Sequence, residues 1–343
     1  MNDPSQQHIG TPALIRRFAP YLMRYKRILI FDLFCAALTT LCDIVLPKIM
    51  SYLTNAATDP GIVLTVDAVL KLALLYLILR LIDGAAQYFM SGTGHIMGVY
   101  IETDMRRDAF AHLQRLSHTY YSNTKVGQIM GRITNDLFEV TEFSHHCPEE
   151  FFIAGLKIVI SFIILARIHL LLTVMVFIFV PIMTIVCRMI NRKMRSAFGQ
   201  QRYQIGELNA KIEDSLLGQK VVKAFTNEEL EKEKFEEGNQ EFLKIKTYTY
   251  MLMGMFNTST RVFDGLMYLV VILGGGYFLM EQQILPGDMV AYVMYVSTLI
   301  ATIRRIIEFA EQFQRGMTGI ERFFEIMDSP VEITEKPDAR ALI

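Results

Sequence analysis

Charged residues occur inside several long apolar stretches of the sequence, in groups with a spacing typical of helices. They are Asp43, Arg80, Asp83, Arg261, Asp264, Arg304, Arg305 and Glu308. Spacings of three and four residues place opposite charges on one face of a helix. Asp43 differs from the others because no oppositely charged residue lies three or four positions from it.

Ionisable groups at membrane depth are costly and often mark a transport pathway. The charges predict a polar belt in an inward-open cavity, where it would contact an amphipathic substrate or a charged headgroup. The alternative is that each pair only neutralises itself and so eases insertion. We expect the paired groups at similar depth in the inner-leaflet half and Asp43 nearer the outer side. Asp43 is the best single candidate for substrate contact or gating.

The composition favours a membrane protein. The 343 residues are 52% hydrophobic and only 20% charged, and the mean hydropathy is +0.30. These values exclude a disordered or disulfide-stapled secreted protein. A net charge of -1 provides no global basic field, so we expect no nucleic-acid partner.

The apolar stretches predict an all-α polytopic membrane protein with six transmembrane helices, since a span needs about 20 apolar residues. The expected spans are 28–50, 66–90, 151–166, 170–190, 255–280 and 289–312. Spans three and four form one apolar stretch, and Arg167 and His169 near its middle indicate a tight turn. Together the spans make one transmembrane domain, residues 28–312.

Orientation follows from the Lys and Arg residues outside the spans. Twenty-five lie on the side of the two termini and the long connections, and one lies on the other side. Both termini are therefore expected in the cytoplasm, in the cell (inner or plasma) membrane. Residues 1–27 predict a cytoplasmic N-terminus with an interfacial elbow helix, the alternative being a flexible basic arm. Residues 313–343 predict a cytoplasmic extension and linker.

The connections 91–150 and 191–254 are rich in helix formers and predict two long helical hairpins in the cytoplasm. Each has a candidate break at its tip, residues 117–127 and 218–227. In the second tip Val221, Val222 and Phe225 share one face. Apolar side chains so far from the membrane favour a cytosolic partner domain as their contact, although packing within the hairpin is the alternative.

Three segments of the sequence resemble the transmembrane domain of ABC exporters of the six-helix, domain-swapped type, the class of lipid flippases and multidrug exporters. The first is residues 120–136 (YYSNTKVGQIMGRITND), and the second is residues 212–225 (IEDSLLGQKVVKAF). The third pairs residues 286–292 (PGDMVAY) with residues 319–328 (GIERFFEIMD). They occur in the family's order and place about residues 11 to 335 in register with it.

The resemblance implies that the two hairpin tips are coupling helices, which dock on ATP-binding domains. Coupling helix 1 would comprise Ser117, His118, Thr119, Tyr120, Tyr121, Ser122 and Asn123. Coupling helix 2 would comprise Gly218, Gln219, Lys220, Val221, Val222, Lys223, Ala224 and Phe225. The implied partners are the bilayer, nucleotide-binding domains and a second transmembrane half in a homo- or heterodimer, with spans four and five swapped between the halves.

The chain holds no GxxxxGK[ST] phosphate loop and no LSGGQ-like signature. We therefore expect no catalytic residue and no cofactor on this chain, with ATP and Mg bound by a nucleotide-binding domain after a linker at residues 330–337. The full-length protein is expected to be an ATP-hydrolysing translocase that works by alternating access on a lipid, drug-like amphiphile or peptide. The alternatives are an ion-gradient-driven carrier or channel and a motor-less assembly scaffold.

Two adjacent histidines raise the question of a metal site. His145 and His146 lie beside Cys147 and Glu149. Because adjacent residues on a helix point in different directions, we expect no metal site from these four residues.

Overall fold

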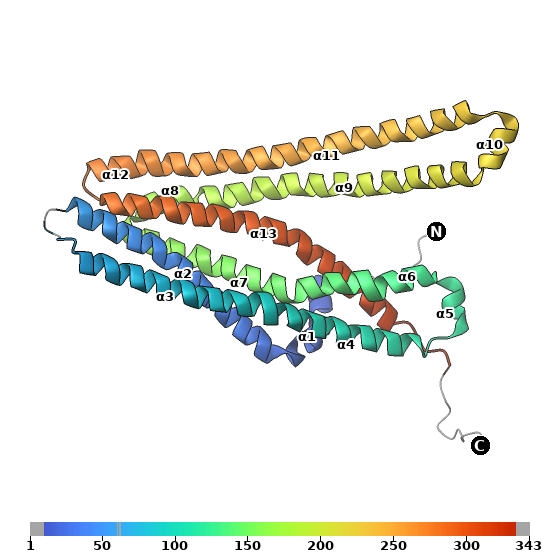
Figure 1. The fold of residues 1–343 in the computed structure, drawn as a ribbon, viewed down its shortest axis with the longest axis horizontal. Helices are drawn as coiled ribbons and strands as arrows, with labels where there is room; N and C mark the ends of the chain where they lie inside the picture. Colours follow the sequence, from blue (N-terminus) through green and yellow to red (C-terminus); the bar gives the residue numbers. More distant parts are fainter. Residues whose placement is uncertain (1–9, 60, 62, 334–343) are drawn as a thin grey trace, which may run out of the picture. The chain divides into compact units, whose positions relative to one another are not determined.

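The structure, a computed structural model, describes residues 10–59, 61 and 63–333 (Figure 1). The described residues form helices and contain no strand, which confirms the all-α expectation. The α-helices are α1 (Thr11–Arg24), α2 (Lys26–Thr58), α3 (Val66–Phe89), α4 (His95–Leu113), α5 (His118–Asn123), α6 (Val126–Gly131), α7 (Leu137–Ile168), α8 (Leu170–Phe177), α9 (Phe179–Leu217), α10 (Gln219–Phe225), α11 (Glu228–Val270), α12 (Gly276–Met280) and α13 (Pro286–Met327). Three π-helical turns lie between consecutive α-helices. They are η1 (Met90–Gly94), η2 (Arg132–Asp136) and η3 (Val271–Gly275).

The helices divide into two compact units. Unit 1 comprises residues 1–168 and 284–343, and unit 2 comprises residues 169–283. The boundary at 168/169 coincides with the turn expected between spans three and four. There His169 has an extended backbone and its Nδ1 accepts a hydrogen bond from the Leu172 amide at 3.2 Å, which caps α8.

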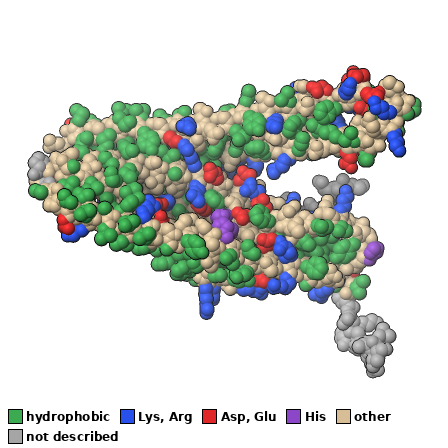
Figure 2. Space-filling model, viewed as in Figure 1, with side chains coloured by type: hydrophobic (Ala, Val, Ile, Leu, Met, Phe, Trp, Pro, Cys, Tyr) green, Lys and Arg blue, Asp and Glu red, His purple; other side chains and the backbone are tan. Residues whose placement is uncertain are grey.

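Five helical stretches are long and apolar enough to cross a bilayer, judged by length and composition. They are Lys26–Thr58, Val126–Ile168, Leu170–Leu217, Glu228–Met280 and Pro286–Met327. The remaining expected span falls on α3, which is not among these five. It has 24 residues and a length of about 36 Å. Many apolar side chains of these stretches are exposed, and Figure 2 shows them as extensive hydrophobic surface.

In unit 1, α13 packs along α7 and α2. Two fully buried tyrosines of α13 fix this packing. The Tyr295 hydroxyl donates to the Ile44 carbonyl of α2 at 2.7 Å, and the Tyr292 hydroxyl donates to the Leu165 carbonyl of α7 at 3.0 Å. Further along α13, Gly316 allows close approach, because a Cβ there would lie 2.2 Å from the Phe143 Cβ.

Helix α1 is a packed element of unit 1. Leu14 and Phe18 are buried in its main hydrophobic core. Arg17 forms a 2.6 Å ion pair with Asp328 at the end of α13, and Arg24 pairs with Asp104 of α4. Residues 11–24 are therefore not a flexible arm. Residues 1–9 and 334–343, parts of the expected terminal segments, lie outside the described residues.

Unit 2 is a long helical hairpin. Helices α9 and α11 have 39 and 43 residues, or roughly 58 and 64 Å, and they pack against each other. The Gln204 amide donates to the Glu241 carboxylate at 3.1 Å across this packing. The prediction that the 191–254 connection is mostly helical is confirmed. The short helix α10 separates α9 from α11 at the tip of the hairpin (Figure 1).

Candidate functional site: a charged cavity among four helices

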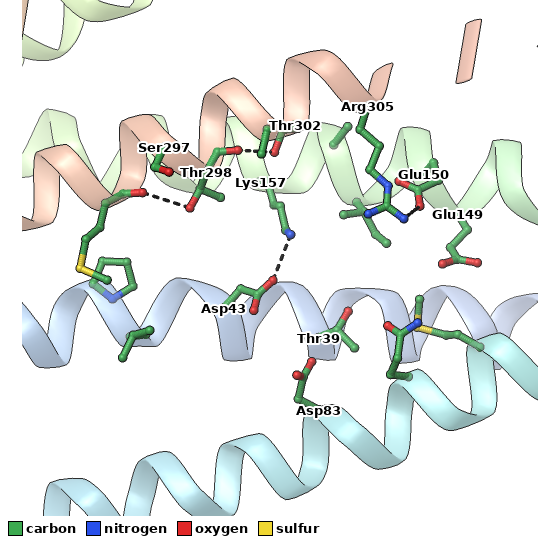
Figure 3. A pocket seen from close by; sticks show the side chains of 18 of the residues that line it. Thr39, Asp43, Asp83, Glu149, Glu150, Lys157, Ser297, Thr298, Thr302 and Arg305 are labelled. Atoms are coloured by element: carbon green, nitrogen blue, oxygen red, sulfur yellow. Dashed lines mark hydrogen bonds and ion pairs between the residues drawn. The ribbon is translucent and has the colours of Figure 1, made fainter. Parts of the chain in front are cut away.

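A cavity of about 570 Å³ lies in unit 1 among α2, α3, α7 and α13. Seven ionisable side chains line it, four acidic and three basic. They are Asp43, Arg80, Asp83, Glu149, Glu150, Lys157 and Arg305. The size is in the range of ligand-binding sites. Figure 3 shows how the labelled side chains of the different helices face the same space.

Asp43 of α2 joins three helices through its carboxylate. Its Oδ2 accepts a hydrogen bond from the Lys157 ammonium of α7 at 3.0 Å. Its Oδ1 lies 3.3 Å from Arg80 Nη1 of α3. Arg80 also contacts the Asp83 carboxylate at 2.9 Å and the Tyr76 hydroxyl at 3.0 Å. Charge-assisted hydrogen bonds of this kind are stronger than neutral ones, so the network fixes the side chains around the cavity.

A second ion pair connects α13 with α7 in the same cavity. Arg305 Nη2 lies 2.5 Å from Glu150 Oε1, and the Glu150 side chain is only 6% exposed. Glu149, next to it on α7, is also buried. Two carboxylates therefore face the space that one guanidinium enters, and this part of the lining is acidic (Figure 3).

The rest of the lining is polar without charge, or apolar. Two α13 hydroxyls donate hydrogen bonds within their own helix, Thr298 to the Met294 carbonyl at 3.1 Å and Thr302 to the Thr298 carbonyl at 2.8 Å. Two irregularities border the cavity, Pro47 inside α2 and Met90 at the start of η1. Proline and π-turns interrupt regular helical hydrogen bonding and often accompany functional sites.

The structure brings half of the eight predicted charges together. Asp43, Arg80, Asp83 and Arg305 line the cavity. Arg304 and Glu308 lie on α13 outside its lining, and Arg261 and Asp264 lie on α11 in unit 2. The in-helix pair of Arg80 and Asp83 is present as expected.

The contacts of two predicted residues reach across helices. The carboxylate of Asp43, expected nearer the outer side than the paired groups, lies 3.3 Å from Arg80 Nη1 of α3. Asp43 has partners on other helices, which a search along its own helix could not find. Arg305 pairs with Glu150 of α7 rather than staying within a cluster on its own helix.

Sequence reasoning missed the three charged residues that α7 contributes. Lys157 is inside the expected third span, and its isolation in an apolar stretch was the signal that could have found it. Glu149 and Glu150 directly precede the expected start of that span at residue 151. In the structure α7 is continuous from Leu137 to Ile168, so both glutamates belong to the same helix as Lys157.

The first hairpin has a short helix at its tip, where one was expected. Helix α5 covers His118–Asn123, and Tyr120 and Tyr121 pack on a small buried cluster of Leu113, Leu116, Ile129 and Ile326. The Tyr121 hydroxyl donates to the Leu113 carbonyl at 2.7 Å. This tip is therefore anchored to the hairpin by its aromatic residues.

The second tip, α10, is more open. Val221 and Phe225 are 62% and 73% exposed. A cavity of about 1080 Å³ lies beside α10, between the ends of α9 and α11. Lys223 Nζ forms a 2.6 Å ion pair with Glu228 Oε1, and this hydrogen bond lowers the pKa of Glu228. The exposed apolar face expected at this tip is thus present, and charged side chains surround it (Figure 2).

Comparison with known proteins identifies the family. The family model described as the ABC transporter transmembrane region matches residues 29–303. The chain belongs to this family. A similar protein is the uncharacterized ABC transporter ATP-binding protein YwjA of Bacillus subtilis (strain 168), 32% identical over 330 residues that cover 95% of this chain and 56% of the relative.

Two further relatives of this ABC transporter chain carry more specific names. The putative multidrug export ATP-binding/permease protein YgaD of Bacillus subtilis (strain 168) is 24% identical and is matched over 95% of this chain and 57% of its own length. The fatty acid ABC transporter ATP-binding/permease protein of Mycobacterium bovis is 26% identical over 67% of this chain and 37% of its own. The chain thus spans about half the length, or less, of these relatives. It is a multi-pass membrane protein of the ABC exporter type.

Proposed function

We propose that the chain forms the transmembrane half of an ATP-driven exporter and builds its substrate pathway by alternating access. The observation that carries this proposal is the charged cavity, whose lining comes from four separate helices of unit 1. Side chains from several helices can separate or approach when the helices move. Such a cavity can therefore open to one side of the membrane and close to the other.

The cavity favours an amphipathic substrate with a polar headgroup. Arg80, Lys157 and Arg305 offer positive charge, and the facing carboxylates offer negative charge. Between the charges, residues such as Leu46 and Ile153 supply apolar contact. A lipid, a drug-like amphiphile or a peptide fits this mixture. The names of two relatives, one for multidrug export and one for fatty acids, support the same range.

In this proposal α5 and α10 are the coupling helices. They dock on nucleotide-binding domains, which bind ATP and Mg, and the chain itself holds no ATPase motif. The support is the exposed apolar face of α10, with Phe225 and Val221. ATP-driven closure of the motor domains would move both tips together. The long helices α9 and α11 would transmit this movement as levers.

The functional transporter is proposed to pair two transmembrane halves, identical or different, in the cell membrane with both termini in the cytoplasm. Unit 2, residues 169–283, contains the fourth and fifth spans and their hairpin, and it clusters as a body separate from unit 1. This division supports an exchange of unit 2 between the two halves. Residues 11–24 would form the interfacial elbow at the cytoplasmic surface.

Charge reversal in the cavity tests the proposal. The complete native polypeptide is reconstituted in liposomes, and ATP hydrolysis is measured with and without candidate amphiphiles. Asp43→Lys and Arg305→Glu should each reduce the stimulated rate at least tenfold. Asp67→Lys is the matched control, because its ion pair with Lys71 is highly exposed at the start of α3, and it should leave the rate within twofold.

Unchanged stimulation in both cavity variants would refute the proposal. The alternatives give distinct results in the same liposomes. An ion-gradient-driven carrier or channel would move substrate without ATP and respond to an imposed gradient. A motor-less assembly scaffold would move none under either condition.

A further inference from the structure

Three histidines from two helices meet in unit 1, and none of them lines the charged cavity. His95 is the first residue of α4, and His145 and His146 lie on α7. The ring centroids are 4.2 Å apart for His95 and His145, 4.8 Å for His95 and His146, and 4.1 Å for His145 and His146. One ring nitrogen from each residue lies within 4.8 Å of the other two. His95 lies on α4, outside the stretch of α7 from which no metal site was expected.

The helices can approach here because of a glycine one turn after His95. A Cβ on Gly98 would lie 2.8 Å from Thr141 Cγ2 and 3.0 Å from His145 Nδ1. Any side chain at this position would push α4 away from α7. Gly98 therefore sets the distance at which His95 faces the two α7 histidines.

The hydrogen bonds of His145 and His95 occupy one nitrogen of each ring and leave the other nitrogen available as a ligand atom. His145 Nδ1 lies 2.8 Å from the Thr141 carbonyl. A carbonyl only accepts, so Nδ1 carries the proton and Nε2 keeps the lone pair. That Nε2 is buried without a hydrogen-bond partner. His95 Nδ1 faces the Met90 carbonyl at 3.4 Å in the same way.

In His146 the two ring nitrogens have different surroundings. Its Nε2 lies 3.7 Å from a Glu142 carboxylate oxygen, and its Nδ1 is buried without a hydrogen-bond partner in the described residues. Buried polar atoms without partners are rare and call for an explanation. Histidines that bind metals typically direct their second nitrogen to a carbonyl or a carboxylate. His145 and His95 show this arrangement, and His146 Nε2 faces the Glu142 carboxylate at a longer distance.

An unpaired negative charge lies beside the cluster. Both carboxylate oxygens of Asp32 are buried and have no hydrogen-bond partner among the described residues. Asp32 contacts the backbone just before His95, since a Cβ on Gly94 would lie 2.7 Å from Asp32 Oδ1. A buried carboxylate without a cation is costly. A divalent cation on the adjacent imidazoles would offset its charge.

We propose that His95, His145 and His146 form a binding site for a transition-metal dication of the zinc class, which connects α4 to α7. Three imidazoles with a water as fourth ligand are a common tetrahedral set for zinc, with bonds of about 2.0–2.1 Å and nitrogens about 3.4 Å apart. The three ring nitrogens lie within 4.8 Å of one another, so metal binding requires the side chains to bring them closer together. Nitrogen donors exclude Mg²⁺ and Ca²⁺, which prefer oxygen. This site is independent of the proposed transport function.

Titration of the complete, tag-free polypeptide in detergent with Co²⁺ tests the site. After treatment with a chelator, the wild type should bind one Co²⁺ per chain, show the visible bands of tetrahedral cobalt, and release it to Zn²⁺. His145→Gln and His95→Gln should each weaken binding at least 100-fold. His112→Gln is the control, because His112 is on α4 outside the cluster, with its ring on the Ser329 carbonyl; it should bind as the wild type does.

Thermal unfolding gives a second readout. Zn²⁺ should raise the Tm of the wild type and of His112→Gln in a concentration-dependent manner and leave that of His95→Gln unchanged. His95 is only half-buried, so His95→Gln decides the question if His145→Gln does not fold. Wild-type binding no tighter than that of His95→Gln, or cobalt bands that persist in that variant, would overturn the proposal.

Discussion

Neutralising Asp43 should destabilise the protein mainly through Lys157. In Asp43→Asn the carboxylate charge is lost. Arg80 retains its contacts to Asp83 and Tyr76. Among the residues that the structure describes, the Lys157 ammonium forms its ion pair with Asp43, at 3.0 Å. The variant therefore removes the direct ion-pair partner of Lys157 at a site where the Lys157 side chain is only 20% exposed.

The cost falls between two known limits. Exposed ion pairs contribute about 0–1 kcal/mol, and removing one partner of a buried pair costs about 3–5 kcal/mol. Asp43 is 36% exposed, so we expect Asp43→Asn to lower the free energy of unfolding by about 1.5–2.5 kcal/mol. The double variant Asp43→Asn/Lys157→Met, which also lacks the ammonium, should recover part of the lost free energy of unfolding. We expect a coupling energy of about 1–2 kcal/mol in the double-mutant cycle.

Unfolding titrations of the wild type and the three variants in mixed micelles, followed by the helical circular-dichroism signal, measure this coupling. The control cycle uses Asp67 and Lys71, another carboxylate–ammonium pair at 2.7 Å whose side chains are 72% and 76% exposed. It should give less than about 0.5 kcal/mol. Equal coupling in both cycles would refute the conclusion that the cavity network is energetically connected across helices.

Three further outcomes are expected. Gly316→Ala should destabilise the protein by about 1–3 kcal/mol through overpacking against α7, while Gly155→Ala, where a Cβ has open space, should not; equal unfolding midpoints would contradict this packing. Because Lys223 lowers the pKa of Glu228 below its ordinary 4.5, the contact stabilises the α10 tip above pH 4.5 and is lost as the pH falls through the lowered pKa. Hydrogen exchange in α10 should therefore differ between wild type and Glu228→Gln at neutral pH and converge in acid, and a difference that grows in acid would contradict the sign. Phe225→Ala should reduce substrate-stimulated ATPase at least fivefold without a shift in Tm, since Phe225 is 73% exposed; a loss of Tm with normal stimulation would assign it a packing role instead.

The sequence predicts those features that depend on local patterns. Apolar runs and helix formers determined the six expected spans and the long hairpin arms, and the turn at His169 follows from polar residues within an apolar run. The tip α10 was found because Gly218 and the polar residues 226–227 interrupt a strong helical pattern. Each of these signals lies within a few residues of the structure that it specifies.

The contacts between helices were not predictable in the same way. Asp43 pairs with Lys157, which is 114 residues away in the sequence. Arg305 of α13 pairs with Glu150 of α7. Such pairs depend on helix rotation and register, which tertiary packing sets. The histidine cluster shows the same limit, because His95 joins His145 only where Gly98 lets two helices approach.

The central claim is that ATP changes the side of the membrane to which the charged cavity opens. Ser297 of α13 lines this cavity (Figure 3), so Ser297→Cys can report access once the buried Cys35, Cys42, Cys147 and Cys187 are replaced. In liposomes containing the complete polypeptide, a membrane-impermeant thiol reagent should label this position from the cytoplasmic side without nucleotide and from the opposite side in an ATP-trapped state. Labelling that ATP leaves unchanged, or that an ion gradient alone reverses, would contradict the account.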